Sequence, residues 1–520
     1  MIKRSHTIGL IGLTTSGITT MIGSGWMLAG WKMSRIAGPA AIIAWPIGAL
    51  VIFLLALNYA ELGSNYPERG GMARYTQMSH GSFAGFISAW AGWISIVATT
   101  SIEAVSTVQY ASSWEWTWAR DLYNKHTLML TNTGFIFSVV LLIAYFLANY
   151  WSIRLLIRFN ILLVIVKIVI PIVTCLALFH AAFSHYHTLD ISRGNFTPYG
   201  VSGIFTAFAT GGVIFSFLGF QTPVNLSGEA RNPRRDIPLA ILISIIVITL
   251  IYVVLQIAFV GALSPQDIIN GWHALNMNSP YIHLALAFNL QWLVTTIYVG
   301  AFVSPSGAGM LFTTTGSRML YAIEKNGYMP KVISKLDPVF NVPRVALFVT
   351  LLVAIAFLWL FRGWSSLVSI VSVAILITFA NGPVSAMALR KQNHTVKNGF
   401  RIKGLSVIAP LAFIIVSLSL YWSRWPLTGQ VILIILLGLV IYFYYEICRR
   451  CKRFKADGKS GIWLICYLLS IAFVSYVGST EYGGKGYLNS SMSMIVIILL
   501  ALFYFYWGIR SRIPQHTTVN

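Results

Sequence analysis

Charged side chains are scarce in this sequence of 520 residues: Asp, Glu, Lys and Arg together make up 10% of it. A soluble protein carries roughly a quarter charged residues, so too few are present to cover a water-facing surface. Hydrophobic residues reach 57%. They gather in runs of about 20 residues, which is long enough to cross a bilayer core of roughly 30 Å. The composition excludes a soluble globular protein and predicts a membrane protein.

Cysteines and nucleotide-binding motifs are also few or missing. Four cysteines are too few for a disulfide framework. Cys448 and Cys451 form a CRRC sequence, but a structural zinc site needs a second pair of ligands and none lies nearby, so we interpret them as reduced thiols. The phosphate-binding pattern GxxxxGK[ST] does not occur, and no catalytic dyad or metal set gathers in the apolar runs. We expect neither an enzyme nor a bound cofactor.

The apolar runs predict fourteen spanning segments joined by loops too short for a separate soluble domain. No cleavage site follows the first run, so we interpret it as a span and not as a signal peptide. The segments are expected at residues 7–31, 37–63, 83–111, 134–150, 155–180, 203–227, 239–263, 291–315, 345–361, 365–389, 405–421, 430–446, 462–477 and 491–507. This pattern predicts an all-α polytopic membrane protein.

The formal net charge of +22 has an uneven distribution. Most Lys and Arg residues fall in the tails and in alternate loops on one side, and Lys167 is the only lysine inside a predicted span. This asymmetry follows the positive-inside rule, so both termini are expected in the cytoplasm of a multi-pass protein of the cytoplasmic (inner) membrane. The basic charge therefore records topology, and we expect the lipid bilayer, not nucleic acid, as the partner.

Two predicted spans are interrupted. The first contains GSGW at residues 23–26, and the sixth contains FSFLGFQ at residues 215–221 after a pair of glycines. Each opens what can be read as a five-helix unit, and matched interruptions in two halves indicate the binding site of a transporter. Freed amides at the N-terminus of a half-helix bind a carboxylate, and freed carbonyls bind an ammonium. Close helix packing is the alternative for GSGW alone, but the second break favours a site for an amino acid.

Lys167 lies near the middle of the fifth predicted span. Its side chain cannot easily reach either surface, and a cation at this depth costs about 2.5–3.5 kcal/mol on insertion scales. Burial favours the neutral amine, so this lysine can take up a proton from one side and release it to the other. We hypothesise that Lys167 is the proton-coupling group. A fixed cation neutralised by a partner is the alternative.

Two acidic residues fall inside the apolar pattern. Glu103 lies in the outer half of the third span, where three roles stay open: contact with a substrate ammonium, proton transfer, or neither if it faces a wet vestibule. Glu61 lies near the cytoplasmic end of the second span and is interpreted as interfacial.

Aromatic and histidine clusters stand outside the spans. The outer loop after the fifth span contains His180, His185 and His187. Their spacing permits a metal or pH-sensing site, but without a further ligand we favour a solvated loop. Three tryptophans follow the third span: Trp114, Trp116 and Trp118. An interfacial aromatic belt is favoured over stacking on a substrate. Residues 281–288 are expected to form a short amphipathic segment over an outer vestibule.

Four motifs occur in order along the chain: GSGW, PERGGMARY (residues 67–75), SGEARNPRRDIP (residues 227–238) and SRMLYAIEKNGYMP (residues 317–330). They resemble the amino acid–polyamine–organocation superfamily of permeases. Across nearly its whole length, with four additional C-terminal helices, the chain is most similar to bacterial aspartate–proton symporters. The resemblance implies a five-plus-five inverted-repeat, LeuT-like core, with residues 7–180 and 203–389 as the two repeats and residues 405–507 as helices 11–14.

The resemblance also implies the site. Backbone of the first span is expected to hold the substrate carboxylate, and backbone of the sixth is expected to hold the amine, with Phe215 closing over it. The expected substrate-binding residues are Ile22, Gly23, Ser24, Gly25, Phe215, Ser216, Leu218, Gly219 and Gln221. Lys167 matches the lysine that replaces a sodium ion in proton-coupled members and faces helices 1 and 8, with Ser304 or Ser306 as its neighbour. Many relatives have GFE where this chain has GFQ, and the neutral Gln221 removes a charge that would repel an acidic side chain.

Together these features predict a secondary active transporter that imports an acidic amino acid, aspartate or glutamate, with protons by alternating access. Lys167 and Glu103 are the candidate proton-coupling residues, and the proton is the only coupling ion expected. An amino acid exchanger of the glutamate-antiporter kind, a permease for neutral amino acids and a non-transporting membrane sensor are the alternatives. Substrate preference, stoichiometry and oligomeric state stay open.

Overall fold

The computed structural model describes residues 8–67, 71–151, 153–182, 196–340, 342–392, 400–448 and 453–513. Within these residues, eleven helical stretches are long and apolar enough to cross a membrane, and two shorter apolar helices span Gly200–Ser216 and Arg344–Leu360. Helices occupy all fourteen predicted segments. The prediction of an all-α polytopic membrane protein is therefore confirmed. His185, His187, Cys451 and residues 68–70 of the PERGGMARY motif lie outside the described residues.

The described residues up to Ala182 form seven α-helices of various lengths, one 3-10 helix and a small hairpin. Its elements are α1 (Leu10–Met21), α2 (Gly25–Ala37), η1 (Gly38–Ala40), α3 (Ala41–Asn65), α4 (Gly71–Ala111), α5 (Thr117–Arg120), β1 (Tyr123–Asn124), β2 (Met129–Leu130), α6 (Asn132–Trp151) and α7 (Ile153–Ala182). The strands β1 and β2 pair antiparallel outside the helical bundle.

The second half begins with three short helices where one span was predicted. Its elements are α8 (Gly200–Thr210), α9 (Val213–Ser216), α10 (Thr222–Asn225), η3 (Ser227–Glu229), α11 (Pro233–Ala262), η4 (Trp272–Ala274), α12 (Pro280–Ala287), α13 (Gln291–Lys325), η5 (Lys331–Ser334), α14 (Arg344–Leu360) and α15 (Trp364–Gln392). The C-terminal elements are α16 (Leu405–Trp422), α17 (Leu427–Leu437), α18 (Leu439–Cys448), α19 (Arg453–Val477), η6 (Thr480–Tyr482) and α20 (Ser490–Arg510).

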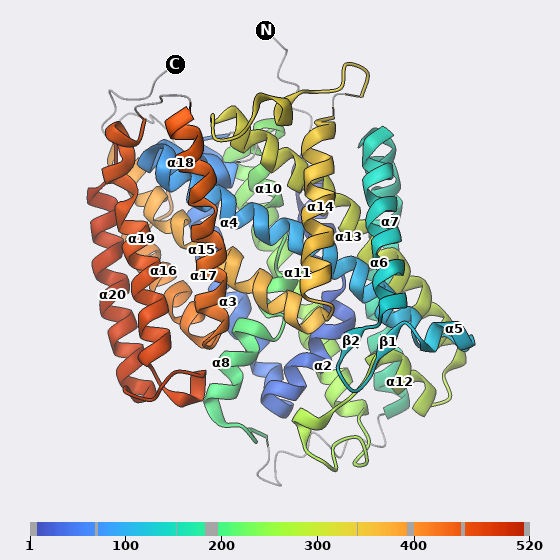
Figure 1. Ribbon diagram of the computed structural model, residues 1–520. Helices are drawn as coiled ribbons and strands as arrows, with labels where there is room; N and C mark the ends of the chain where they lie inside the picture. The colour runs from blue at the N-terminus through green and yellow to red at the C-terminus, as the bar shows by residue number, and fades with distance from the viewer. Residues whose placement is uncertain are drawn as a thin grey trace.

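Helices α4 and α15 form the centre of the bundle. In the most apolar stretch of α4, 100% of the residues are buried, and in that of α15, 94% are. In α6 only 28% of these residues are buried. Figure 1 shows α4 running obliquely through the middle, with α19 and α20 at one edge and α6 and α7 at the opposite edge. α4 packs against both α13 and α15. A polar group on α4 is thus held inside the protein, away from lipid.

The helices α16, α19 and α20 pack beside this centre, against α3, α4 and α15. They lie far from α7 in Figure 1. The proposed division into repeats at residues 7–180 and 203–389 stays a prediction. The interruptions do fall in the first helix of each predicted unit, between α1 and α2 and within α8–α10.

Several predicted spans were too short: α4 begins at Gly71 and not at residue 83, and α13 ends at Lys325 and not at residue 315. The first span was expected to end at Trp31, but α2 continues to Ala37 and ends at Gly38, which has a positive φ of 63°. Lys32 and Arg35 therefore lie inside a helix and not in an outer loop. The short segment predicted at residues 281–288 is observed as α12.

The two ends of the described chain lie on the same side. Ile8 pairs with Ala230, after α10, and the backbone N–H of Ile513 donates to the carbonyl of Ser79 near the start of α4. We call this side inner and the side that carries α5 and α12 outer. The cytoplasmic location of the inner side stays a prediction.

Near the inner end of α3, Glu61 is buried, with 5% of its surface exposed. Its expected position at the membrane interface stays a prediction. The Arg390 Nε atom lies 3.0 Å from Glu61 Oε1, and the Ile402 backbone N–H donates to Glu61 Oε2 over 2.8 Å. This ion pair joins α3 to the end of α15 and to the segment that precedes α16.

Candidate substrate site

The predicted interruption of the first span is present. α1 ends at Met21 and α2 begins at Gly25, and Ile22 leaves the helical path with φ −91° and ψ 89°. We call residues 22–24 the helix-1 break. A helix N-terminus carries a partial positive charge and unpaired N–H groups, so the start of α2 is a place for an anion.

A carboxylate of the protein itself occupies this place. The Ser24 backbone N–H donates to Glu103 Oε2 over 2.9 Å. A Cβ atom at Gly23 would lie 2.3 Å from Glu103 Oε1, so only glycine leaves room for the carboxylate. Glu103 is 1% exposed, and it therefore faces the helix-1 break and not a wet vestibule.

The carbonyls at the end of α1 are bound by side chains from three other helices. Ser304 Oγ of α13 donates to the carbonyls of Gly23 (3.0 Å) and Ile22 (3.3 Å). Tyr252 Oη of α11 donates to the carbonyl of Met21 over 3.1 Å. Because the last carbonyls of a helix lack partners within it, these contacts satisfy the backbone that the break leaves open.

Lys167 completes this set. Its Nζ atom donates to the carbonyl of Thr19 over 3.2 Å, and its side chain is 1% exposed. It interacts electrostatically with Glu103, although among the described residues the two make no ion pair within 4 Å. Of the two serines considered as neighbours, Ser304 binds the adjacent carbonyls, whereas Ser306 accepts a hydrogen bond from Tyr145.

The sixth span is also interrupted, over residues 211–221, which we call the helix-6 break. Gly212 has φ +128° and Gly219 has φ +127°, a conformation that residues with a Cβ rarely adopt. A Cβ atom at Gly219 would lie 2.9 Å from the Met21 nitrogen, and one at Gly25 would lie 2.5 Å from Ser216 Oγ. The two breaks therefore contact each other, as the sequence predicted for one site.

Most contacts within the helix-6 break are local. The Gly219 backbone N–H donates to Gln221 Oε1 over 3.0 Å, and the Leu218 N–H donates to the carbonyl of Phe215 over 3.0 Å. Gln221 thus stabilises the bend of its own segment. Its expected role toward an acidic substrate stays a prediction, as does the binding of an amine by the carbonyls of this segment.

An aromatic pair lies over Ser24. The Trp364 Nε1–H donates to Ser24 Oγ over 3.0 Å, and the Phe215 ring lies edge-on to the Trp364 ring with centroids 5.9 Å apart. Both side chains are buried. Sequence reasoning identified Phe215 but missed Trp364, because no local pattern links the start of α15 to a residue 340 positions earlier.

Lys32 was missed as well. It is 6% exposed, and its Nζ atom donates to the carbonyl of Ser365 (2.7 Å) and to Ser369 Oγ (2.9 Å). The available signal was the Gly38–Pro39 pair, which marks the true end of α2 better than the first charged residue does.

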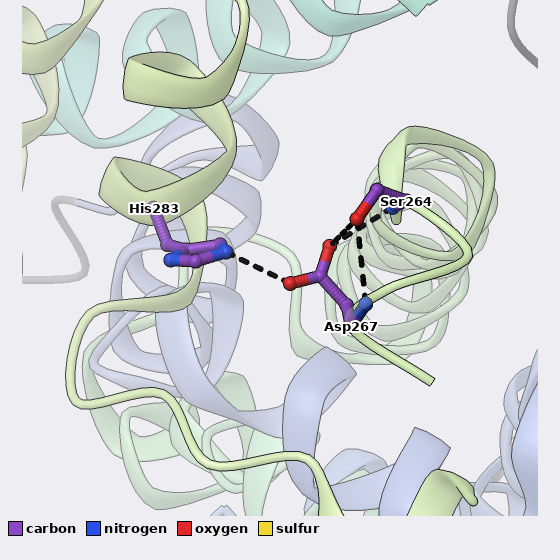
Figure 2. A network of polar contacts seen from close by, with 3 residues as sticks. All are labelled: Ser264, Asp267 and His283. Carbon is purple, nitrogen blue, oxygen red and sulfur yellow. Dashed lines mark hydrogen bonds and ion pairs between the residues drawn. The ribbon is translucent and has the colours of Figure 1, made fainter. Parts of the chain in front are cut away.

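A polar network lies in the outer loop between α11 and α12. Figure 2 shows His283 of α12 facing Asp267, which also binds Ser264 just after α11. His283 Nε2 lies 3.0 Å from Asp267 Oδ1, and the Ser264 N–H and hydroxyl donate to Oδ2 over 2.9 and 2.7 Å. The hydrogen bonds from His283 and Ser264 lower the pKa of Asp267 to about 2. Because Tyr281 of α12 stacks on Trp26 of α2 at 6.0 Å, this loop is tied to the outer half of the first span.

Comparison with known proteins shows what this chain is similar to. The family model described as amino acid permease matches residues 8–446. The chain is 49% identical over 508 residues to the glutamate/serine transporter AimA of Bacillus subtilis (strain 168), covering 97% of this chain and 93% of that protein. It is 33% identical over 519 residues to the aspartate-proton symporter of the same organism, covering 98% and 97%. The branched-chain amino acid permease BcaP is 26% identical over 459 residues, covering 84% and 92%.

Proposed function

Because this chain belongs to the amino acid permease family, we propose that it is a secondary active transporter that imports glutamate, and also serine, together with protons. The names of two relatives support this proposal, since one is a glutamate/serine transporter and another an aspartate-proton symporter. The observation that carries it is the buried Glu103 carboxylate on the Ser24 amide, beside Lys167.

The Glu103 carboxylate stands where a substrate carboxylate would bind. An amino acid brings its own carboxylate to the start of α2, and two carboxylates at one site cannot both remain charged without strong repulsion. Substrate binding therefore favours the uptake of a proton by Glu103, which then releases the Ser24 amide. The proton moves from the outer solution to the Glu103 carboxylate, and no covalent bond other than that O–H bond forms.

Lys167 is the second member of the coupling pair. While the site is empty, its positive charge favours the ionised form of Glu103, which in turn stabilises the protonated amine. Once Glu103 takes up a proton, the buried ammonium loses this support, so Lys167 releases its own proton to the inner solution when the site opens inward. After the substrate leaves, the proton on Glu103 passes to Lys167 and the carboxylate returns to the Ser24 amide, so the cycle carries a proton inward. The protonation states of Glu103 and Lys167 therefore depend on whether substrate is bound.

The substrate amine is assigned to the helix-6 break. Backbone carbonyls from Phe215 to Leu218 would accept its hydrogen bonds, and Phe215 with Trp364 would cover it from the outer side. Alternating access then rocks α1–α3 and α8–α11 against the remaining helices of the two repeats. We place the protein in the cytoplasmic membrane with both termini inside, as the distribution of Lys and Arg indicates.

Uptake of labelled glutamate and serine into proteoliposomes tests the proposal. An inward proton gradient should accelerate uptake by the wild type in vesicles without internal amino acid. Lys167→Ala should lose this acceleration, whereas Lys485→Ala, which removes an outer-loop lysine, should retain it. Undiminished acceleration in Lys167→Ala would refute the coupling role. Uptake that requires internal amino acid and ignores the gradient would show an exchanger instead.

A further inference from the structure

We infer that Lys32 recognises the side-chain carboxylate of an acidic substrate. This inference rests on the proposed function and assigns the part of the same site that distinguishes glutamate from a neutral amino acid. No arginine lies in the two interrupted spans, residues 7–31 and 203–227, and the sequence had placed Lys32 outside the membrane.

The position of Lys32 on α2 directs its ammonium toward the helix-1 break. Lys32 follows Gly25 by seven residues, so it lies two turns, or about 10 Å, further along the same face of the helix. Side chains of an α-helix lean toward its N-terminus, which here is the break. Accordingly, Lys32 Nζ lies 5.9 Å from the centre of the Trp364 ring, and the Trp364 N–H binds Ser24.

The other side of the ammonium faces the helix-6 break. Lys32 Nζ donates to Ser369 Oγ over 2.9 Å, and that hydroxyl lies 3.5 Å from the carbonyl of Thr210. Thr210 is the last residue of α8, directly before the helix-6 break. A helix C-terminus favours a positive charge. A single side chain therefore separates Lys32 from each break: Trp364 from the helix-1 break and Ser369 from the helix-6 break. Lys32 lies on the outer side of both.

The charge of Lys32 has no fixed counterion. Among the residues that the structure describes, no carboxylate lies within 4 Å of its ammonium, which is bound by one carbonyl and one hydroxyl. An ammonium has three N–H donors, so one remains for another acceptor. Burying a charge without a partner is unfavourable, and Arg390, by contrast, has Glu61 at 3.0 Å. A buried cation whose partners are dipoles and not a fixed carboxylate is suited to bind a substrate anion reversibly.

The geometry selects the class of substrate. An amino acid held by its carboxylate at Ser24 and by its amine at the helix-6 break directs its side chain toward the outer layer that contains Lys32. In this conformation the Trp364 ring lies between the ammonium and Ser24, so we place the ion pair in the outward-open conformation, after the ring has moved aside. Glutamate and aspartate gain the pair, whereas serine and glutamine do not.

Competition against labelled serine in proteoliposomes tests this inference. In the wild type, unlabelled glutamate should inhibit about tenfold more strongly than glutamine, which has the same shape without the charge. Lys32→Gln should remove most of this preference, and Lys32→Arg should keep part of it. The matched control is Arg35→Gln, which removes a cation one turn further out on α2, where Arg35 donates to the carbonyl of His273. It should leave the preference unchanged.

Three results would overturn the inference. The first is equal inhibition by glutamate and glutamine in the wild type, which would overturn the inference before any variant is measured. An unchanged preference in Lys32→Gln would do so as well. An equal loss of affinity for glutamate, glutamine and serine would show that Lys32 only supports the fold. A wild type that takes up neither serine nor glutamate would instead refute the proposed function on which the inference rests.

Discussion

The two breaks differ in what stabilises their unwound backbone. In the helix-1 break, side chains of α4, α7, α11 and α13 bind the free amide and carbonyls, and two of them, Glu103 and Lys167, are ionisable. In the helix-6 break, the chain relies on glycines with positive φ and on the local contact of Gln221. The difference indicates a division of labour: the helix-1 break responds to charge, whereas the helix-6 break provides the bend and the aromatic cover.

The largest expected effect comes from Gly23→Ala. Its Cβ atom would meet Glu103 Oε1 at 2.3 Å, so the carboxylate must leave the Ser24 amide. Hydrogen bonds to charged groups contribute about 1.5–3 kcal/mol, so we expect gradient-driven uptake to fall about tenfold or more. Gly9→Ala is the control, because no atom lies within 4 Å of its Cβ position. Gradient-driven uptake equal to that of the control would contradict the assignment of charge to this break.

Gly219→Ala should have the second-largest effect, and of a different kind. It forces a side chain onto φ +127°, at a cost of about 1–3 kcal/mol, and brings its Cβ atom to 2.9 Å from the Met21 nitrogen. We expect a lower unfolding temperature and slower uptake, with the ratio between uptake with and without a proton gradient unchanged. Gly404→Ala shares the positive φ but has open space, so it separates strain from the clash. If Gly219→Ala, but not Gly404→Ala, changed the ratio between uptake with and without a proton gradient, the helix-6 break would also respond to charge. That result would contradict the division of labour between the two breaks.

Much of this comparison was visible in the sequence. The spans follow from apolar runs, and both breaks follow from glycines that interrupt them. The partners of each break could not be predicted in the same way. Glu103 lies 79 residues from Ser24, and Trp364 lies 340 residues from it. Periodicity reports only which face of a helix is apolar, and it does not report which distant helix packs there.

Lys32 shows a second limit of sequence reasoning. A hydropathy pattern ends a span at the first charge, so a lysine inside the outer turns of α2 was assigned to a loop. Lys167 was identified because apolar residues continue on both sides of it. A charged residue near the end of a span can be placed only when the true end of the helix is known.

Gln221→Glu should have a moderate effect. The variant places a negative charge in the helix-6 break, which lacks one. It should leave the fold and the contact between Glu103 and the Ser24 amide intact. Like charges repel, so we expect glutamate uptake to fall several-fold relative to serine uptake. Gln221→Met is the control for loss of the contact with Gly219 alone. Equal uptake ratios in the two variants would show that Gln221 matters only for the local bend.

The smallest effect is expected in the outer loop, away from both breaks. Because the pKa of Asp267 is lowered to about 2, its contribution to stability is present above about pH 4 and is lost as the pH falls toward 2. Exposed pairs of this kind contribute less than about 1 kcal/mol. Asp267→Asn should therefore lower the unfolding temperature slightly at pH 7 and pH 5, and the difference from the wild type should shrink between pH 4 and pH 2. If the difference in unfolding temperature between Asp267→Asn and the wild type grew between pH 4 and pH 2, the lowered pKa of Asp267 would be contradicted.

The entry of protons together with substrate tests the central claim most directly. A pH-sensitive dye inside proteoliposomes reports acidification when glutamate is added outside. We predict that the wild type acidifies the interior, and that Glu103→Gln, which still binds labelled glutamate, does not. Acidification by Glu103→Gln at the wild-type rate per glutamate would contradict the claim that the carboxylate at the helix-1 break couples substrate to protons.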